Sequence, residues 1–493
     1  MTTVSASLKY RQSLCLNGDW DFMPLYEEPL RRELPERLVY ARKVRVPSSW
    51  RSSFVNGQGK LFGEIPEHGY APMDLHGYPE EWKAADAGVL HRSFRVPAEM
   101  AGQRIVLRLD GIMQKAVVYL DHEKLAVWED GYLPLRLDVT NWVTPGGEHD
   151  LHVVCGNFDK VTIASGQQKT TGLTGSWFSY VCRGIWQDVW LESYPRVALS
   201  DVVIRTSFRQ GTLEVDAAIE AIEAMGAMEA AGSPSENGMP ALTATLSVRE
   251  WGSGGSGPGS APVLRAEAKV RLGEAKPNLC ENDPAGIRTY QAQFRLDWKD
   301  ARLWSPDDPF LYEAEIALRT AGGEPIDVRT ETFGFREFWT EGPRFVLNGV
   351  PINLRGDSWH FQGGIQMTDA YVRNWYRMCR EVGINCVRLH AEPYPTRYLD
   401  IADEEGMLIV DETAIYGSGK TMQADHPDYL ANCEAHIRRL LRRDKNHPSV
   451  ILWSLQNEMR WVDGRDGFKR FMPGWMAMMK EIDPTRPIVA EGD

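Results

Sequence analysis

The chain carries, at residues 443–458, the stretch RDKNHPSVILWSLQNE, in which an apolar strand leads directly into an Asn-Glu pair. At the end of such a strand, the side chains of Asn457 and Glu458 would be presented together. A carboxylic acid at the mouth of a parallel barrel can be desolvated enough to stay protonated near neutral pH and to donate its proton to a glycosidic oxygen. The alternative interpretation of the dipeptide alone is a solvated strand end, so the flanking residues decide between the two.

The region from Arg336 onward alternates short apolar strands with amphipathic helices, which is typical of parallel βα units. We expect strands at residues 352–355, 386–390, 408–411, 450–455 and 487–490. Helices are expected from Thr368 as N-cap to Gly383, from near Thr396 to Gly406, and before Pro448 and Pro484. The last helix is expected to bury Phe468, Phe471, Trp475, Met476 and Met479.

The earlier part of the chain has the pattern of two β-sandwiches. The whole chain has 493 residues, which is longer than one hydrophobic core usually serves. Residues 14–194 form short alternating apolar stretches separated by Gly, Asp and Pro turns, which predicts an all-β sandwich. Residues 195–335 predict a smaller, immunoglobulin-like sandwich, in which the low-complexity segments 217–238 and 252–262 are expected to be loops.

Polar side chains cluster where the predicted parallel strands end, which is where chemistry gathers in a barrel. They are Asp357, Trp359 and His360, then Arg388, His390 and Glu392, then Asp411 and Glu412, then Asn457 and Glu458, and finally Glu491 and Asp493. Imidazoles and amides among carboxylates suit a polyhydroxylated ligand such as a pyranose, because each hydroxyl both donates and accepts hydrogen bonds.

Each of these residues also has a structural interpretation. His390 or Arg388 could be tied to a neighbouring carboxylate, and Asp411 is better suited to orienting a neighbour than to catalysis. Trp359 and Trp453 could stack on a sugar face or simply pack beside the barrel.

The composition limits the partners. A net charge of −13 argues against a nucleic-acid surface, which needs clustered Lys and Arg. Neither a signal-peptide core at residues 1–14 nor an apolar stretch of membrane-spanning length is found, so no membrane partner is expected. Seven scattered cysteines without CxxC spacing favour reduced packing residues over disulfides or zinc. We expect a cytoplasmic location, with secretion left open.

Four stretches together resemble glycoside hydrolase family 2, the β-galactosidase, β-glucuronidase and β-mannosidase group. They are GIWQDVWL at 184–191, FVLNGVPINLRG at 345–356, NCVRLH at 385–390, and residues 446–458. The resemblance implies a jelly-roll-like, sugar-binding β-sandwich over 1–195 and an immunoglobulin-like β-sandwich over 196–335. It also implies a (β/α)8 TIM barrel, of which about the first five strands are present, over 336–493, and a retaining double displacement.

The same resemblance implies roles for individual residues. Glu458 resembles the general acid/base, Asn457 the amide that holds the sugar 2-hydroxyl, and His360, Arg388 and His390 subsite residues. Trp359 and Asp411 complete the predicted substrate contacts. The family's nucleophilic glutamate lies on the seventh strand, which we expect beyond Asp493, since Glu491 would be on the wrong strand.

The resemblance also bears on metals. Family members with a divalent cation beside the acid carry Glu and His shortly after the third strand, whereas these positions here are Tyr416 and Ser418. We therefore expect no metal there and no cofactor.

The function that follows is an exo-acting, retaining β-glycosidase, most similar to a β-galactosidase. Its expected partners are a carbohydrate substrate and further copies of the chain in a homo-oligomer. β-Glucuronidase and β-mannosidase specificities stay open. The alternative from another class is a non-catalytic carbohydrate-binding or assembly protein with an incomplete barrel.

Overall fold

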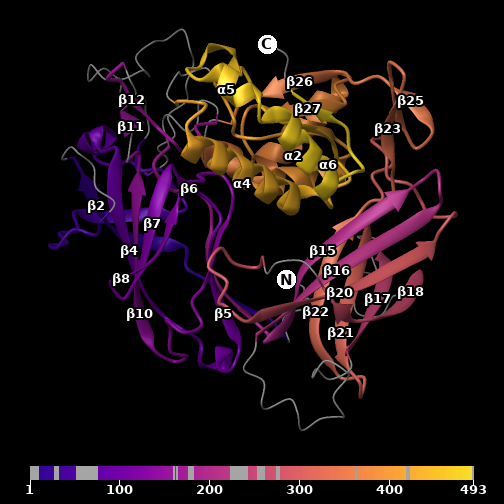
Figure 1. Ribbon diagram of the computed structural model, residues 1–493, viewed down its shortest axis with the longest axis horizontal. Coiled ribbons are helices and arrows are strands. Elements are labelled where there is room, and N and C mark those ends of the chain that lie inside the picture. The colour runs from indigo at the N-terminus through magenta and orange to yellow at the C-terminus, as the bar shows by residue number, and fades with distance from the viewer. Residues whose placement is uncertain are drawn as a thin grey trace.

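The computed structural model describes residues 10–26, 33–51, 76–158, 161–162, 165–175, 182–222, 242–251, 261–273, 278–361, 364–417 and 422–490. Figure 1 shows three bodies of secondary structure: a β-sandwich in indigo and purple, a second one in magenta and salmon, and an α/β body in orange and yellow that lies across both. The chain passes through them in this order, as the sequence predicts.

The first sandwich consists of two antiparallel sheets. One has the strand order β1-β14-β5-β9 and the other β3-β2-β4-β10-β7-β8. The bounds are β1 Gln12–Cys15, β2 Gly18–Leu25, β3 Arg42–Val46, β4 Ala87–Arg95, β5 Arg104–Leu109, β7 Lys115–Leu120, β8 Glu123–Trp128, β9 Leu135–Asp138, β10 Glu148–Gly156 and β14 Val189–Tyr194. Two short pairs accompany them, β6 Ile112–Met113 with β13 Gly184–Ile185 and β11 Val161–Thr162 with β12 Gln168–Lys169. Apolar side chains from both large sheets, including Phe22, Leu107, Val118 and Leu191, form one core between them.

The second sandwich pairs the sheet β15-β16-β20-β19 with the sheet β18-β17-β21-β22. The bounds are β15 Val197–Ser207, β16 Thr212–Ile222, β17 Leu242–Glu250, β18 Leu264–Lys269, β19 Arg271–Leu272, β20 Ile287–Asp297, β21 Tyr312–Thr320 and β22 Pro325–Phe333. The predicted loop 217–238 is wrong over 217–222, which is the second half of β16 and pairs with β20. Ala217, Ile219 and Ala221 are every second residue of this segment and are buried in the core. The segment therefore has the alternation of a strand, which its alanine-rich composition did not suggest. The rest of that loop, and 252–260, lie outside the described residues.

The α/β body contains a parallel sheet with the strand order β26-β27-β28-β29-β30. The bounds are β26 Gly356–Trp359, β27 Cys386–Leu389, β28 Leu408–Glu412, β29 Val450–Ser454 and β30 Ile488–Val489. Sequential strands are neighbours throughout, as in the first part of a barrel. Four of the five predicted strands are confirmed.

The first predicted strand, 352–355, is wrong. Its start belongs to β25 (Val350–Ile352) in a small antiparallel sheet with β23 (Phe338–Glu341) and β24 (Arg344–Leu347). Asn348 and Gly349 both have positive φ, 51° and 80°, and form a tight two-residue hairpin that folds β25 back onto β24. The first parallel strand therefore begins at Gly356, and Asp357 and Trp359 lie within it rather than after it.

The helices lie largely where the sequence predicts them. They are α2 Asp369–Glu381, α3 Thr396–Glu405, α4 Pro427–Asp444, α5 Arg465–Lys469 and α6 Met472–Ile482. Thr368 caps α2, because its hydroxyl accepts a hydrogen bond from the Tyr371 N–H (3.3 Å), and Gly406 ends α3 in the left-handed region.

The last predicted helix is instead two. Pro473 in the first turn of α6 has no N–H to continue the ladder from α5. Phe471, between the two helices, is 45% exposed rather than buried.

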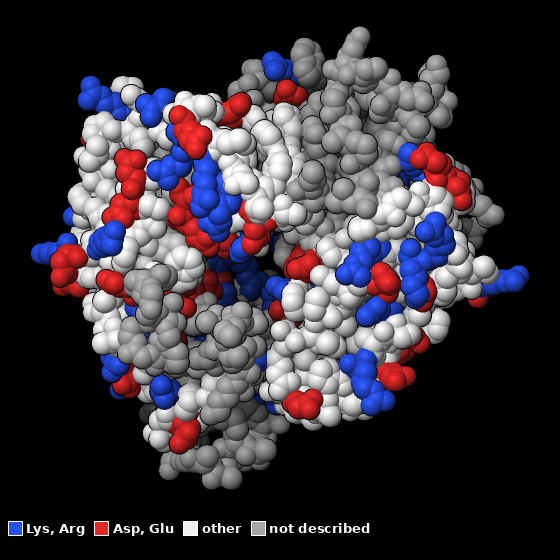
Figure 2. Space-filling model, turned by 180° about the vertical axis from the view of Figure 1, so that it is seen from behind, with Lys and Arg blue, Asp and Glu red and all other residues white. Residues whose placement is uncertain are grey.

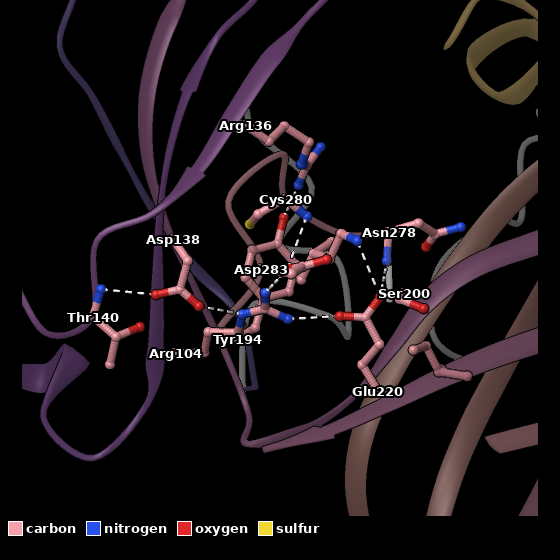
Figure 3. Close-up of polar contacts among 12 residues, drawn as sticks. Arg104, Arg136, Asp138, Thr140, Tyr194, Ser200, Glu220, Asn278, Cys280 and Asp283 are labelled. Atoms are coloured by element: carbon pink, nitrogen blue, oxygen red, sulfur yellow. Dashed lines mark hydrogen bonds and ion pairs between the residues drawn. The ribbon is translucent and has the colours of Figure 1, made fainter. Parts of the chain in front are cut away.

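Buried polar contacts join the two sandwiches. Arg104 of the first sandwich contacts three carboxylates: Asp138 (2.8 Å) in its own domain, and Glu220 (2.7 Å) and Asp283 in the second sandwich (Figure 3). Burial and the neighbouring Glu220 carboxylate raise the pKa of Asp283 to about 6. Because a buried charge is stable only when it is paired, this network holds the two sandwiches in one arrangement.

Two further expectations concern the cysteines and the membrane. All seven cysteines lie within the described ranges, and each is a free thiol; only Cys15 is exposed. No helix in the described part of the chain is both long enough and apolar enough to cross a lipid bilayer.

Candidate active site

Glu458 lies four residues after the end of the fourth parallel strand, β29, where the chain turns sharply. Its φ of 50° places it in the left-handed region, which non-glycine residues rarely adopt, and the short 3-10 helix Met459–Trp461 follows. Gly417 packs against this turn, and a Cβ at that position would lie 2.4 Å from the Glu458 carbonyl oxygen. The turn leaves the Glu458 side chain half-buried while Asn457 is fully buried. Such backbone strain is found where a site needs one side-chain direction.

The amide of Asn457 is held from both sides. Its Oδ1 accepts a hydrogen bond from Arg388 Nη2 (2.8 Å), and its Nδ2 donates to His390 Nε2 (3.0 Å). Arg388 is itself clamped by two hydrogen bonds to Glu412, at 2.9 and 3.0 Å. The amide can therefore present its remaining donor and acceptor positions in one fixed orientation.

Glu412 fixes the position of Arg388 and, through it, of the Asn457 amide. It is fully buried, and besides Arg388 it accepts hydrogen bonds from the Ala391 N–H and the Ser454 hydroxyl. Burial raises its pKa, and the Arg388 guanidinium opposes that effect. Sequence reasoning placed Glu412 at the strand end but assigned it no partner. Its positioning of Arg388 is a finding of the structure.

The rings of the two histidines of the site, His360 and His390, lie close together and tilted by 41°, with ring centroids 4.0 Å apart. Burial, together with the charge of Arg388 and the neighbouring His360 ring, lowers the pKa of His390 to about 3. Burial and Arg388 also lower the pKa of His360, while Asp357 and Glu458 act in the opposite direction. Both rings are therefore neutral near pH 7, and His390 can accept the Asn457 hydrogen bond at Nε2.

Two residues that the sequence predicts to contact the sugar, Asp411 and Trp359, have other neighbours in the structure. Asp411 is fully buried beside Asp444, and burial and that second carboxylate raise its pKa well above the ordinary range. Side chains alternate along β28, and of these two carboxylates Glu412 is the one that turns to the polar cluster of Arg388 and Asn457, so the structure does not favour the substrate contact of Asp411, which stays a prediction. Trp359 packs on Trp375 of α2, with centroids 4.4 Å apart, which is the packing alternative.

The first sandwich contributes to the same end of the sheet, which the sequence did not reveal. The Gly175 N–H donates to the Ala414 carbonyl (3.1 Å), and the Thr174 hydroxyl donates to the Tyr416 carbonyl (3.4 Å). Lys169 forms an ion pair with Asp463 (3.2 Å). No local pattern signals this approach, because it joins residues more than two hundred positions apart.

Several remaining strand-end residues have other surroundings. Glu392 is buried next to Gly175, where a Cβ would lie 3.0 Å from its Oε2. Tyr416 packs edge-on against His390, with centroids 5.8 Å apart. Ser418, Glu491 and Asp493 lie outside the described residues, so the predicted absence of a metal beside Tyr416 stays a prediction.

Three segments of the chain match known protein families. Residues 14–195 match the sugar-binding domain of glycosyl hydrolases family 2, residues 262–336 match glycosyl hydrolases family 2, and residues 336–493 match its TIM-barrel domain. The chain therefore belongs to glycoside hydrolase family 2, as its sequence motifs predicted.

Individual curated proteins and solved structures are also similar to this chain. The chain is 26% identical to a β-galactosidase of Pectobacterium atrosepticum and 24% identical to one of Klebsiella pneumoniae, over 97% of this chain and 42% of each relative. It thus spans less than half the length of these curated relatives. A β-glucuronidase from Ruminococcus gnavus in complex with uronic isofagomine has a TM-score of 0.70 at 21% identity, covering 99% of this chain and 74% of that one. A Bacteroides uniformis β-glucuronidase has a TM-score of 0.67 at 21% identity, covering 97% and 52%. At this identity the likeness shows the fold.

Proposed function

We propose that the complete protein is a retaining exo-β-glycosidase of the β-galactosidase type and that Glu458 is its general acid/base. The observation that carries the proposal is the half-buried carboxyl group of Glu458 next to an Asn457 amide that Arg388 and His390 hold in place. A carboxylic acid so placed can protonate the leaving glycosidic oxygen, then as carboxylate activate the water that releases the sugar.

The other residues bind and orient in this proposal. Asn457 would hold a sugar hydroxyl next to the reacting carbon. His360, which is neutral, can donate or accept a hydrogen bond to a further hydroxyl, whereas His390, whose Nε2 accepts from Asn457, carries its proton on Nδ1 and can act there only as a donor. Arg388 acts chiefly through Asn457, because Glu412 and that amide already use its guanidinium.

A retaining mechanism needs a second carboxylate about 5–5.5 Å from the acid, on the other side of the scissile bond. We assign this nucleophile to no described residue. The family resemblance predicts it on the seventh strand of the barrel, beyond Asp493.

The sugar is proposed from the relatives. The curated relatives named above are β-galactosidases and match nearly the whole of this chain, whereas the β-glucuronidases share its fold at lower identity. We therefore place a terminal β-galactoside first and a β-glucuronide second. A cytoplasmic location and a homo-oligomeric state stay predictions.

The test is a panel of nitrophenyl β-glycosides offered to the full-length gene product. We expect hydrolysis of the β-galactoside to exceed that of the β-glucuronide and β-mannoside by about tenfold or more in kcat/KM. A reversed order would correct the sugar and leave the glycosidase intact. If the folded protein binds sugars but hydrolyses none of the three, the non-catalytic carbohydrate-binding alternative is the correct one.

A further inference from the structure

A buried contact between an aspartate and a histidine joins the first sandwich to helix α4. Asp130 lies in the loop between β8 and β9, and its Oδ2 is 2.9 Å from Nδ1 of His436. Figure 2 shows charges of both signs lying side by side on the molecular surface, where water weakens such pairs. Asp130 and His436 differ from these surface pairs, because they are only 2% and 0% exposed. The glycosidase mechanism proposed above assigns them no role.

The surroundings of His436 determine which of its ring nitrogens carries the proton. Its Nε2 lies 2.9 Å from the Ala414 backbone nitrogen, and because an N–H group can only donate, Nε2 is the acceptor. The ring proton is therefore on Nδ1, which donates it to Asp130. Asp130 is itself fixed, because its Oδ1 accepts from the N–H groups of Tyr132 (3.1 Å) and Leu133 (3.3 Å). The carboxylate thus selects the tautomer that can accept from Ala414.

Ala414 belongs to the segment 413–417, which runs beside Asn457. The Asn457 N–H donates to the Ile415 carbonyl (2.9 Å), and the Gly417 N–H donates to the Asn457 carbonyl (3.1 Å). The segment therefore forms a short backbone ladder with the chain around Asn457. A shift of Ala414 would move this ladder, and with it the amide that is proposed to hold the sugar, where small displacements are costly for catalysis.

The same loop of the first sandwich supports Ala414 by a second route. The Tyr132 hydroxyl donates to the Thr174 carbonyl (2.9 Å), and the next residue, Gly175, donates its N–H to the Ala414 carbonyl (3.1 Å). The Ala414 N–H is thus bound by His436 and its carbonyl by Gly175. Both routes start in the loop between β8 and β9 and end on Ala414, so the position of the first sandwich is transmitted to the candidate site.

We propose that His436 is a positioning residue of the glycosidase, that Asp130 holds it in the required tautomer, and that the first sandwich in this way sets the Asn457 amide for catalysis. The inference rests on the proposed function, because it concerns the amide that would bind the sugar. His436 acts through Ala414 and does not touch the substrate. A contact that served only to attach the first sandwich would stabilise the protein without changing the rate of folded molecules.

The test is Asp130→Asn in the full-length gene product. The new carboxamide oxygen can keep the hydrogen bonds from Tyr132 and Leu133, while its NH2 group faces His436 and can only donate there. The ring proton then moves to Nε2, where it opposes the Ala414 N–H. We expect kcat/KM to fall by about tenfold or more, by the same factor for natural and nitrophenyl β-galactosides, because Asn457 would hold the sugar and not the leaving group.

Asp403→Asn is the matched control. Asp403 is also buried and contacts a histidine, His447 (2.6 Å), but it lies at the amino end of the parallel sheet. Each variant is assayed well below its unfolding temperature, so that a general loss of stability does not alter the rate. Asp403→Asn should keep kcat/KM within about twofold of the unaltered enzyme. Equal losses in the two variants would overturn the proposal.

A double-mutant cycle separates positioning of Asn457 from an unrelated defect. Arg388→Lys also loosens the Asn457 amide, because Arg388 donates to its Oδ1. When it is combined with Asp130→Asn, the loss of kcat/KM should be smaller than the product of the two single losses by about threefold or more. Losses that simply multiply would show that Asp130 and Arg388 do not act on the same group.

A measurement on the unaltered protein tests the proposal if Asp130→Asn does not fold. The NMR spectrum of protein labelled with ¹⁵N-histidine should show His436 protonated at Nδ1 alone near neutral pH. A ring protonated at Nε2 cannot accept from Ala414 and would refute the positioning role. If Glu458→Gln lowers hydrolysis while Asp130→Asn leaves it unchanged, only this role fails. If the full-length product hydrolyses no glycoside, the proposed function fails, and the positioning role fails with it.

Discussion

The two ends of β29 differ in what their polar side chains contact. At the amino end, Lys445 pairs with Asp201 (2.7 Å), and Asn446 accepts from the Ile204 N–H (3.0 Å) and donates to the Val202 carbonyl (2.9 Å). At the carboxyl end, Asn457 is held by Arg388 of β27 and by His390, which follows that strand, and Glu458 stays half-buried. The residues before β29 therefore join the barrel to the second sandwich, and the residues after it form the candidate active site.

Two histidines show the same difference. At the amino end His447 contacts Asp403 (2.6 Å), and although burial alone would lower its pKa, that carboxylate raises it to about 9. At the carboxyl end burial, His360 and Arg388 lower the pKa of His390 to about 3. A fixed positive charge is compatible with the amino end, whereas the sugar binding proposed for the carboxyl end is better served by neutral rings.

The largest expected effect is that of Glu458→Gln in the full-length gene product. Without a proton donor, kcat for natural β-glycosides should fall by about 10²–10⁴-fold. Glycosylation by nitrophenyl glycosides should fall less, because their leaving groups need little protonation. Steady-state and burst kinetics on both substrate types measure this difference. Unchanged rates on both would show that the carboxyl end of β29 does not carry the acid.

Arg388→Lys tests whether the amide of Asn457 must be held. Lysine keeps the charge but cannot bind Glu412 twice and Asn457 at once, so kcat/KM should fall by about 10–100-fold with the fold intact. Arg377→Lys is the control, since Arg377 also binds a carboxylate, Glu405, through two nitrogens but is 56% exposed on α2. Equal losses in both variants would contradict a special role for Arg388.

Asn446→Ala tests the contact at the amino end of β29. The change leaves the Ile204 N–H and the Val202 carbonyl without their side-chain partner, which should destabilise the protein by about 2 kcal/mol. Urea denaturation measures the loss, and the exposed Asn141→Ala should stay within about 0.5 kcal/mol. If the two variants unfolded alike, the contact between Asn446 and β15 would not stabilise the assembly.

The smallest expected effect is pH-dependent. Because the folded pKa of His447, about 9, exceeds the unfolded value, its stabilisation is full below about pH 6.5 and is lost as the pH rises through about 9. His447→Gln should therefore cost about 1–2 kcal/mol near pH 6 and little above about pH 9.5. Denaturation across this pH range tests the sign, and a deficit that grew with pH would contradict the assignment of charge to the amino end.

Much of the barrel could be predicted from local sequence. The Thr368 cap, the Gly406 stop and the apolar run 450–455 act within a few residues, and the structure places helices and a strand there. The strand 352–355 and the single last helix were wrong because the Asn348-Gly349 turn and Pro473 outweighed hydrophobic periodicity.

The candidate site was predictable only in part. Asn457 and Glu458 follow from the end of an apolar strand. The different fates of Asp411 and Glu412 do not, because alternation separates them while only the sheet decides which one faces inward. The approach of Thr174 and Gly175 from the first sandwich has no local signal at all.

By itself, then, the sequence determined the order of the three domains, the positions of most barrel elements and the placement of an acid at a strand end, because periodicity, caps and turns act over short distances. Only the tertiary structure decided the partner of each polar side chain: which carboxylate clamps Arg388, which domain receives Asn446, and which backbone N–H donates to His436. The physical reason is that burial and charge compensation depend on groups that the fold brings together from distant parts of the chain.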